Sequence, residues 1–62
     1  MAQDDQYITF EGYVVHKTAA AILFYIERLD EKVWFPLSIS ELDSDQASIM
    51  VPLWIARERG IL

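Results

Sequence analysis

Apolar and polar side chains alternate along the first part of the chain, from Tyr7 onward. In an extended chain the apolar even positions lie on one side, and these are Ile8, Phe10 and Val14. The odd positions lie on the other side, and these are Thr9, Glu11 and Tyr13. This alternation, with β-branched and aromatic residues, is typical of a strand with one buried face. Gly12 in mid-strand predicts a bulge or a tight bend. The polar residues 16–18 then predict a turn.

A second strand is predicted over residues 19–28, where apolar side chains occupy both faces. Its middle, residues 22–26, is β-branched and aromatic, which favours a strand. The alanines at 19–21 leave a helix as the competing interpretation, because alanine is the best helix former. A turn at 29–32 and a third strand at 32–37 follow. Pro36 has no N–H to donate and is therefore expected at a strand end or a sheet edge.

The segment after Pro36 predicts a short turn and one more strand. Ser38 and Glu41 have the spacing of a capping box, which is typical of the start of a helical turn. Residues 43–46 form a polar loop, and residues 47–51 predict a fourth strand.

The start and stop signals of one helix agree at the C-terminal end. Pro52 is expected at the first helical position, and the helix continues over residues 53–59. Gly60 is placed for the residue just past the helix, with Ile61 contacting Ala56 in a Schellman motif. So short a helix is not stable alone and must dock on the sheet. The side chains expected to dock it are those of Leu53, Trp54 and Ile55.

These elements predict a single small, mainly β domain over residues 7–62. The expected architecture is a four-stranded antiparallel SH3-like barrel or curled sheet with a C-terminal helix of two turns. Residues 1–6 are polar and acidic, and they are expected to form a disordered lead-in.

Composition limits how such a domain is stabilised. A chain of 62 residues buries only about 60% of the surface that its unfolded form exposes. It has no cysteine, so no disulfide can contribute. Its hydrophobic fraction of 53% is more than one small core can hide. An exposed apolar patch or a subunit interface is therefore expected.

The charge and the termini point to a class of partner and a compartment. Ten acidic and five basic residues leave a net charge of −5, which disfavours a nucleic-acid backbone and favours cationic partners. The longest apolar run, residues 19–26, is far shorter than the roughly 20 residues of a membrane span. The N-terminus is acidic, unlike that of a signal peptide. A cytoplasmic protein without membrane contact is the expectation.

Three motifs follow one another in an order that spans most of the chain. They are Lys17-Thr18 with Ala21, Val33-Trp34 with Pro36, Ser38 and Ile39, and Val51-Pro52 with Trp54, Ala56 and Gly60. This order resembles small uncharacterised domains of phage and bacterial proteins, from about residue 12 onward. The resemblance implies a barrel and a phage or mobile-element setting, and it supplies no catalytic residue. Leu37 stands where those domains commonly have a lysine.

Catalytic and metal-binding patterns are weak. His16 is the single histidine, and no serine lies in a nucleophile-elbow pattern. Carboxylates alternate at Glu41, Asp43 and Asp45 like the opening of a calcium loop, but the glycine and the distal glutamate of that loop are missing. The sequence therefore predicts a non-enzymatic protein with no catalytic residue, no metal and no cofactor.

Aromatic side chains form the candidate binding surface. Tyr13, Tyr25 and Trp34 share their strand faces with charged residues, and Leu23 lies on the same face as Tyr25. With the basic residues expected around them, the candidate surface comprises Tyr13, Lys17, Leu23, Tyr25, Arg28, Lys32 and Trp34.

Three interpretations of the aromatic set stay open at this point. Trp34 and Trp54 pack on each other beneath the helix; the aromatic residues are hot spots of a protein interface; or they stack the bases of a single-stranded nucleic acid. The acidic net charge favours a protein partner. Since Leu23 makes its strand apolar on both faces, a cover is needed, and it is either the C-terminal helix or another chain, as in a homodimer. The predicted function is thus a protein-interaction module, as in a phage protein acting on a host component, with single-strand binding as the alternative.

Overall fold

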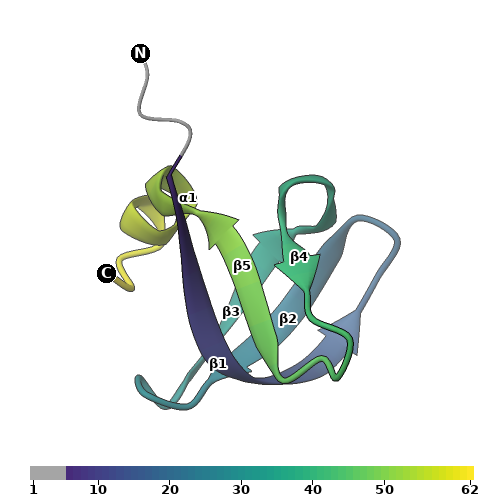
Figure 1. Cartoon of the computed structure of the whole chain (residues 1–62). Coiled ribbons are helices and arrows are strands. Elements are labelled where there is room, and N and C mark those ends of the chain that lie inside the picture. Colours follow the sequence, from purple (N-terminus) through teal and green to yellow (C-terminus); the bar gives the residue numbers. More distant parts are fainter. Residues whose placement is uncertain (1–5) are drawn as a thin grey trace.

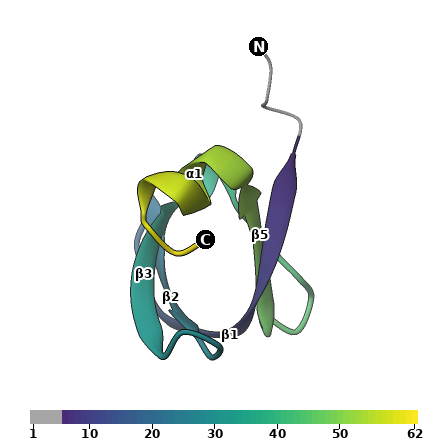
Figure 2. The same ribbon diagram turned by 90° about the vertical axis from the view of Figure 1, so that its left-hand side faces the viewer.

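The computed structural model describes residues 6–62 as one antiparallel sheet with a short C-terminal helix. Its five strands lie in the order β3-β2-β1-β5-β4. Their bounds are β1 Tyr7–Lys17, β2 Ala21–Ile26, β3 Glu31–Pro36, β4 Glu41–Leu42 and β5 Ser48–Pro52. The sheet is strongly curled, and β1 passes from one wall to the other (Figures 1 and 2). The chain is therefore mainly β, as predicted.

The sheet is a curled one and not a closed barrel. Within residues 6–62 the edge strands β3 and β4 pair only with β2 and β5, so the sheet stays open. The prediction of four strands missed β4, which has two residues. Glu41 of β4 lies opposite Met50 of β5.

The capping box predicted with Ser38 and Glu41 does not form. A 3-10 turn, η2 (Leu37–Ile39), starts instead after Pro36 without a side-chain cap.

Gly12 is the point at which β1 changes partners. Residues 7–11 pair with β5, and residues 12–17 pair with β2. The chain passes so close to β2 here that a Cβ on Gly12 would collide with the carbonyl oxygen of Tyr25 and lie 2.8 Å from its carbonyl carbon. Only glycine has no Cβ, so only glycine fits this approach. The bend predicted at Gly12 is confirmed.

The strand β1 contains a bulge at Val15 and continues beyond its predicted end. Val14 lies opposite Phe24, and His16, two residues on, lies opposite Leu23, the next residue of β2. The extra residue shifts the alternation, so that His16 lies on the same face as Tyr13. The predicted turn at residues 16–18 is thus wrong for residues 16 and 17, because both still pair with β2.

Turn chemistry also shortens the predicted second strand. The hydroxyl oxygen of Thr18 accepts hydrogen bonds from the N–H groups of Ala20 and Ala21, at 3.2 and 3.0 Å. Residues 19 and 20 therefore form a bend, and neither a strand nor the alternative helix begins there. At the other end, β2 stops at Ile26 and a turn over residues 27–30 leads to β3.

The core fills the inner face of the curl, beneath α1 (Leu53–Glu58). Alternate residues of the strands contribute to it, as the period of two predicted. Its buried members are Phe10, Ile22, Phe24, Ile26, Phe35, Ile49, Val51, Ile55, Ala56 and Ile61. The rings of Phe10 and Phe35 stack across the interior with centroids 6.4 Å apart.

The helix ends as predicted, and of the side chains expected to dock it Ile55 is confirmed and Trp54 is not. Gly60 has a φ of 72°, and Ile61 donates its N–H to the carbonyl of Ala56 at 3.1 Å, which is the Schellman bond. Pro52 is the N-cap residue, so the helix begins at Leu53, one residue later than predicted. Trp54 is 43% exposed, so the prediction that it anchors the helix is wrong. A helix of six residues turns one face to the sheet, and Ile55 and Ala56 occupy that face.

The N-terminal lead-in predicted for residues 1–6 lies outside the described residues except for Gln6. The carbonyl of Gln6 accepts a hydrogen bond of 2.9 Å from the N–H of Leu53. Among residues 6–62 there is no helix with the length and apolar character needed to cross a membrane.

Candidate binding surface

Two rows of side chains cross the outer face of β1, β2 and β3. Strand register places Tyr13, Tyr25 and Lys32 side by side in one row, and His16, Leu23 and Trp34 in the next. We call this set the aromatic face: Tyr13, His16, Leu23, Tyr25, Lys32 and Trp34. Tyr13 is 53% exposed and Trp34 is 43% exposed. The structure thus brings the aromatic residues of the predicted surface together, with Leu23 between them.

The first row is built on a pair of tyrosines. The ring centroids of Tyr13 and Tyr25 are 4.9 Å apart, with an angle of 31° between the planes. The Tyr25 hydroxyl donates a hydrogen bond of 2.6 Å to Oδ1 of Asp30. Asp30 has a φ of 54° in the turn before β3, which is a conformation that aspartate tolerates better than most residues. The hydrogen bond fixes the position of the Tyr25 ring.

The environment of Tyr25 favours its neutral form. The pKa of the phenol is raised above its ordinary value of 10.0, chiefly because it donates to the Asp30 carboxylate. Partial burial and the negative charges of Asp30, Tyr13 and Glu27 raise the pKa further.

The second row is apolar and depends on the bulge. His16 meets Trp34 edge-on, with ring centroids 6.2 Å apart and planes at 86°. The side chain of Leu23 is half-buried between them. Without the extra residue at Val15, His16 would follow the parity of the core, and this contact would be lost.

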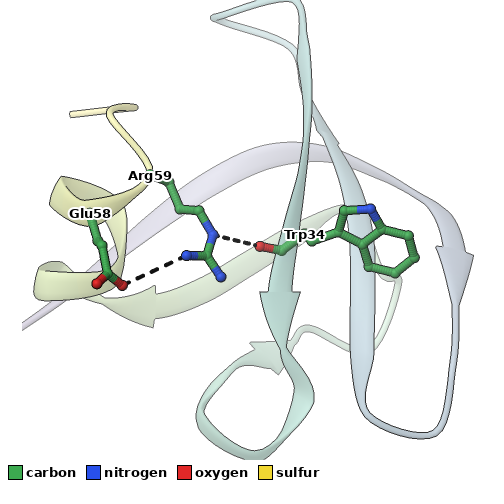
Figure 3. A network of polar contacts seen from close by, with 3 residues as sticks. All are labelled: Trp34, Glu58 and Arg59. Atoms are coloured by element: carbon green, nitrogen blue, oxygen red, sulfur yellow. Dashed lines mark hydrogen bonds and ion pairs between the residues drawn. The ribbon is translucent and has the colours of Figure 1, made fainter.

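The C-terminal end of the helix holds the backbone of Trp34 in place. Among residues 6–62 β3 pairs only with β2, and alternate carbonyls of β3 therefore face the open edge of the sheet. Nε of Arg59 donates to the Trp34 carbonyl at 3.0 Å, and Nη1 of Arg59 lies 3.7 Å from Oε1 of Glu58. Figure 3 shows the indole on the side of β3 away from Arg59. The backbone is held, while the side chain is presented to solvent.

The basic residues do not surround the aromatic face as predicted. Lys32 lies on it, opposite Tyr25. Lys17 pairs with Ile22, a core residue, and so has the parity of the inner face. Arg28 lies over the ring of the buried Phe10, with its guanidinium carbon 5.9 Å from the centroid. The structure therefore brings neither Lys17 nor Arg28 to the aromatic face.

Carboxylates border the tyrosine row instead. Asp30 accepts the Tyr25 hydroxyl, and the charge of Glu27 acts on the same phenol. The N–H of Glu27 donates to the carbonyl of Glu11 at 3.0 Å, and both residues line one hollow beside Gly12. We call Glu11, Glu27 and Asp30 the acidic border. The sequence predicted a turn here but gave no signal that Asp30 in that turn accepts a hydrogen bond from Tyr25, five residues earlier.

The acidic loop and the tryptophan pair do not have the roles that the sequence left open for them. Oδ1 of Asp43 accepts the N–H groups of Ala47 and Ser48, at 2.8 and 3.3 Å, so this carboxylate shapes the turn before β5. Within residues 6–62 no group of three or more potential metal ligands is present. Trp54 and Trp34 are each 43% exposed, so the packing of the two indoles beneath the helix does not occur.

No protein-family model matches the chain, and neither does a curated protein or a solved structure.

Proposed function

We propose that this protein is a non-enzymatic protein-interaction module that binds its partner through the aromatic face. One observation carries the proposal: tyrosine, leucine and tryptophan side chains lie next to one another on the outer face of three adjacent strands. Tyr13 and Trp34 are exposed there, and Leu23 and Tyr25 are half-buried. A small chain places such residues in its core where it can. Their presence on one outer face is typical of an interaction site.

The types of residue and their fixed geometry support a protein partner. Tryptophan and tyrosine are enriched among the residues that contribute most to protein binding. Here Tyr25 is held by Asp30, and the backbone of Trp34 is held by Arg59. Side chains that are already ordered lose less conformational entropy on binding, which increases affinity.

Single-stranded nucleic acid is the second candidate. Exposed aromatic rings on a curled sheet stack bases in many single-strand binding proteins. The acidic border would repel the phosphates, however, and Lys32 is the one lysine or arginine in the two rows of the aromatic face. Charge therefore favours a protein over a nucleic acid.

Two finer proposals concern the class of fold and the setting. The sharp bend of β1, which lets one strand belong to both walls of the sheet, supports an SH3-like variant of the curled sheet. The order of the lysine–threonine and tryptophan–proline motifs supports a phage or mobile-element protein that acts on a host component in the cytoplasm.

Loss of binding in a Trp34→Ala variant tests the proposed surface. Trp54→Ala is the matched control, because both indoles are equally exposed and only Trp34 belongs to the aromatic face. Partners would be captured by cross-linking in a lysate of the source organism and quantified for wild type and both variants. We expect a partner that wild type and Trp54→Ala retain equally, and whose affinity falls roughly thirtyfold in Trp34→Ala, as for a hot-spot residue. Equal retention by all three proteins contradicts the proposal.

A further inference from the structure

We infer that the aromatic face receives a short extended peptide segment with a lysine or arginine two residues from an apolar side chain. This inference rests on the proposed function and specifies the chemistry of the partner. It follows from three properties of the face: its size, its division into two rows, and the distribution of charge around it.

The size of the face argues for a segment rather than a second folded domain. A standard interface covers about 800 Å² on each partner, which is about a fifth of the 4046 Å² of accessible surface of this chain. The aromatic face spans three strands, or roughly 10 Å between the backbones of its outer strands, and two rows roughly 7 Å apart. A homodimer needs a larger surface than this, whereas a short peptide does not.

The division into rows defines what each part binds. The row of His16, Leu23 and Trp34 offers an apolar surface beside an indole. The row of Tyr13 and Tyr25 offers two aromatic rings next to carboxylates. Lysine and arginine bind favourably over aromatic rings, and more so when a carboxylate is within reach. An apolar side chain therefore fits the first row and a cation fits the second.

The charges place the cation at one end of the tyrosine row. Lys32 lies at the β3 end of that row and repels a cation there. Glu11 lies two residues before Tyr13 on β1 and Glu27 two residues after Tyr25, and a backbone hydrogen bond joins the two glutamates. Asp30 is already bonded to the Tyr25 hydroxyl. The cation is thus expected over Tyr13, with Glu11 and Glu27 as its partners.

The distance between the rows specifies the spacing in the peptide. Leu23 and Tyr25 are two residues apart on β2, so the rows are about 7 Å apart. In an extended peptide, side chains at positions i and i+2 lie on one face at the same distance. The segment would then lie along the strands and place one side chain on each row.

Synthetic decapeptides test this inference. The probe is a serine–glycine decapeptide with lysine at one position and leucine two positions later. One comparison peptide has glutamate in place of lysine, another has serine in place of leucine, and a thymidine decanucleotide represents nucleic acid. Binding would be followed by amide chemical shifts of the full chain. We expect the lysine–leucine peptide to shift Tyr13, Leu23 and Trp34, and to bind at least about fivefold more tightly than the glutamate peptide.

A charge variant and its control locate the cation. Glu11→Gln is expected to weaken binding of the lysine–leucine peptide by roughly two- to fivefold, the range for an exposed ion pair. Glu41→Gln makes the same change in net charge on β4, at the far edge of the sheet, and is expected to leave binding unchanged. Equal effects of the two variants would mean that charge acts non-specifically, and the inference would fall.

The outcomes separate this inference from the proposed function. If the glutamate peptide binds the same face as tightly as the lysine peptide, the cationic partner is wrong and the interaction surface stands. If the decanucleotide shifts the same residues and salt abolishes the effect, a nucleic-acid partner replaces both proposals. Concentration-dependent dimerisation that Trp34→Ala abolishes would make a second copy the occupant. If no probe shifts the face and Trp34→Ala captures the same partners as wild type, both proposals fail.

Discussion

Gly12 and Tyr25 approach each other so closely that the backbone of β2 occupies the space where a side chain on Gly12 would begin. This contact lies where β1 leaves β5 and joins β2. The contact links the bend of β1 to the candidate site, because the backbone of Tyr25 contacts Gly12 and the ring of Tyr25 belongs to the aromatic face.

Replacement of this glycine should therefore be among the most destabilising single changes in the chain. Gly12→Ala forces β1 and β2 apart, and we expect it to lower the free energy of unfolding by about 3 kcal/mol or more. Gly60→Ala is the control: its Cβ meets nothing within 4 Å, and its φ of 72° is its only difficulty. That strain costs about 1–2 kcal/mol. Urea denaturation measures the free energy of unfolding of both variants. A Gly12→Ala variant as stable as Gly60→Ala would contradict the close approach of β1 to β2 at Gly12.

The exposed tryptophans should contribute little to stability. We expect Trp54→Ala and Trp34→Ala each to change the free energy of unfolding by about 1 kcal/mol or less, because both indoles are 43% exposed and lie outside the core. Ile55→Ala, the neighbouring buried position of α1, should cost about 2–5 kcal/mol. Thermal and urea unfolding of the three variants checks the order. A loss of several kcal/mol on Trp54→Ala would mean that this indole docks the helix after all.

Titration of Tyr25 gives a prediction with a definite sign. Its pKa is raised in the folded chain, so the bond to Asp30 contributes stability that is fully present below pH 10.0 and is lost as the pH rises from there through the folded pKa. Asp30→Asn keeps a residue that tolerates positive φ and removes the charge. We expect it to lower the pKa of Tyr25, as followed by carbon-13 NMR of labelled tyrosine.

The matched control for this titration is Asp45→Asn, in the turn before β5. It makes the same change in net charge away from the tyrosine row, and should leave the pKa of Tyr25 where it is in wild type. If Asp30→Asn and Asp45→Asn have the same effect, the hydrogen bond between Tyr25 and Asp30 is not the cause of the shift.

Ser40 offers a stabilising change. Its side chain is buried, and its Oγ has no hydrogen-bond partner among residues 6–62. Burial of an unpaired hydroxyl is unfavourable, so Ser40→Ala should raise the free energy of unfolding by about 1 kcal/mol. Ser38→Ala, on the exposed η2 turn, should have little effect. The midpoint of urea unfolding of both variants tests this prediction. A destabilised Ser40→Ala variant would show that the hydroxyl is paired in solution.

Local patterns predicted those parts of the fold that depend on neighbours in sequence. The alternation around Phe10, the bend at Gly12 and the Schellman bond to Ala56 all follow from residue type and spacing. The bulge at Val15 has no local signal, because it exists only in the pairing of β1 with β2. The exposure of Trp54 depends likewise on which side chains of α1 reach the sheet first.

In the candidate site, too, local patterns predicted some features, and others depend on contacts between residues far apart in the sequence. Strand parity placed Tyr13, Leu23, Tyr25 and Trp34 on one face, and register brought them together. Parity alone did not predict that Arg28 would turn to the ring of Phe10. Nor did it predict the bond from Arg59 to the Trp34 carbonyl, since 25 residues separate the two.

The change of partner along β1 has a consequence for the order in which the structure forms. The strands of the aromatic face are consecutive, β1, β2 and β3, so their pairing closes only short loops. The N-terminal half of β1 pairs instead with β5, the last strand among residues 6–62, and this pairing closes a much longer loop and is slower. During synthesis the three strands are complete before β5 and α1 have been made. The face can thus exist as a meander, while closure of the core beneath it waits for the C-terminal residues.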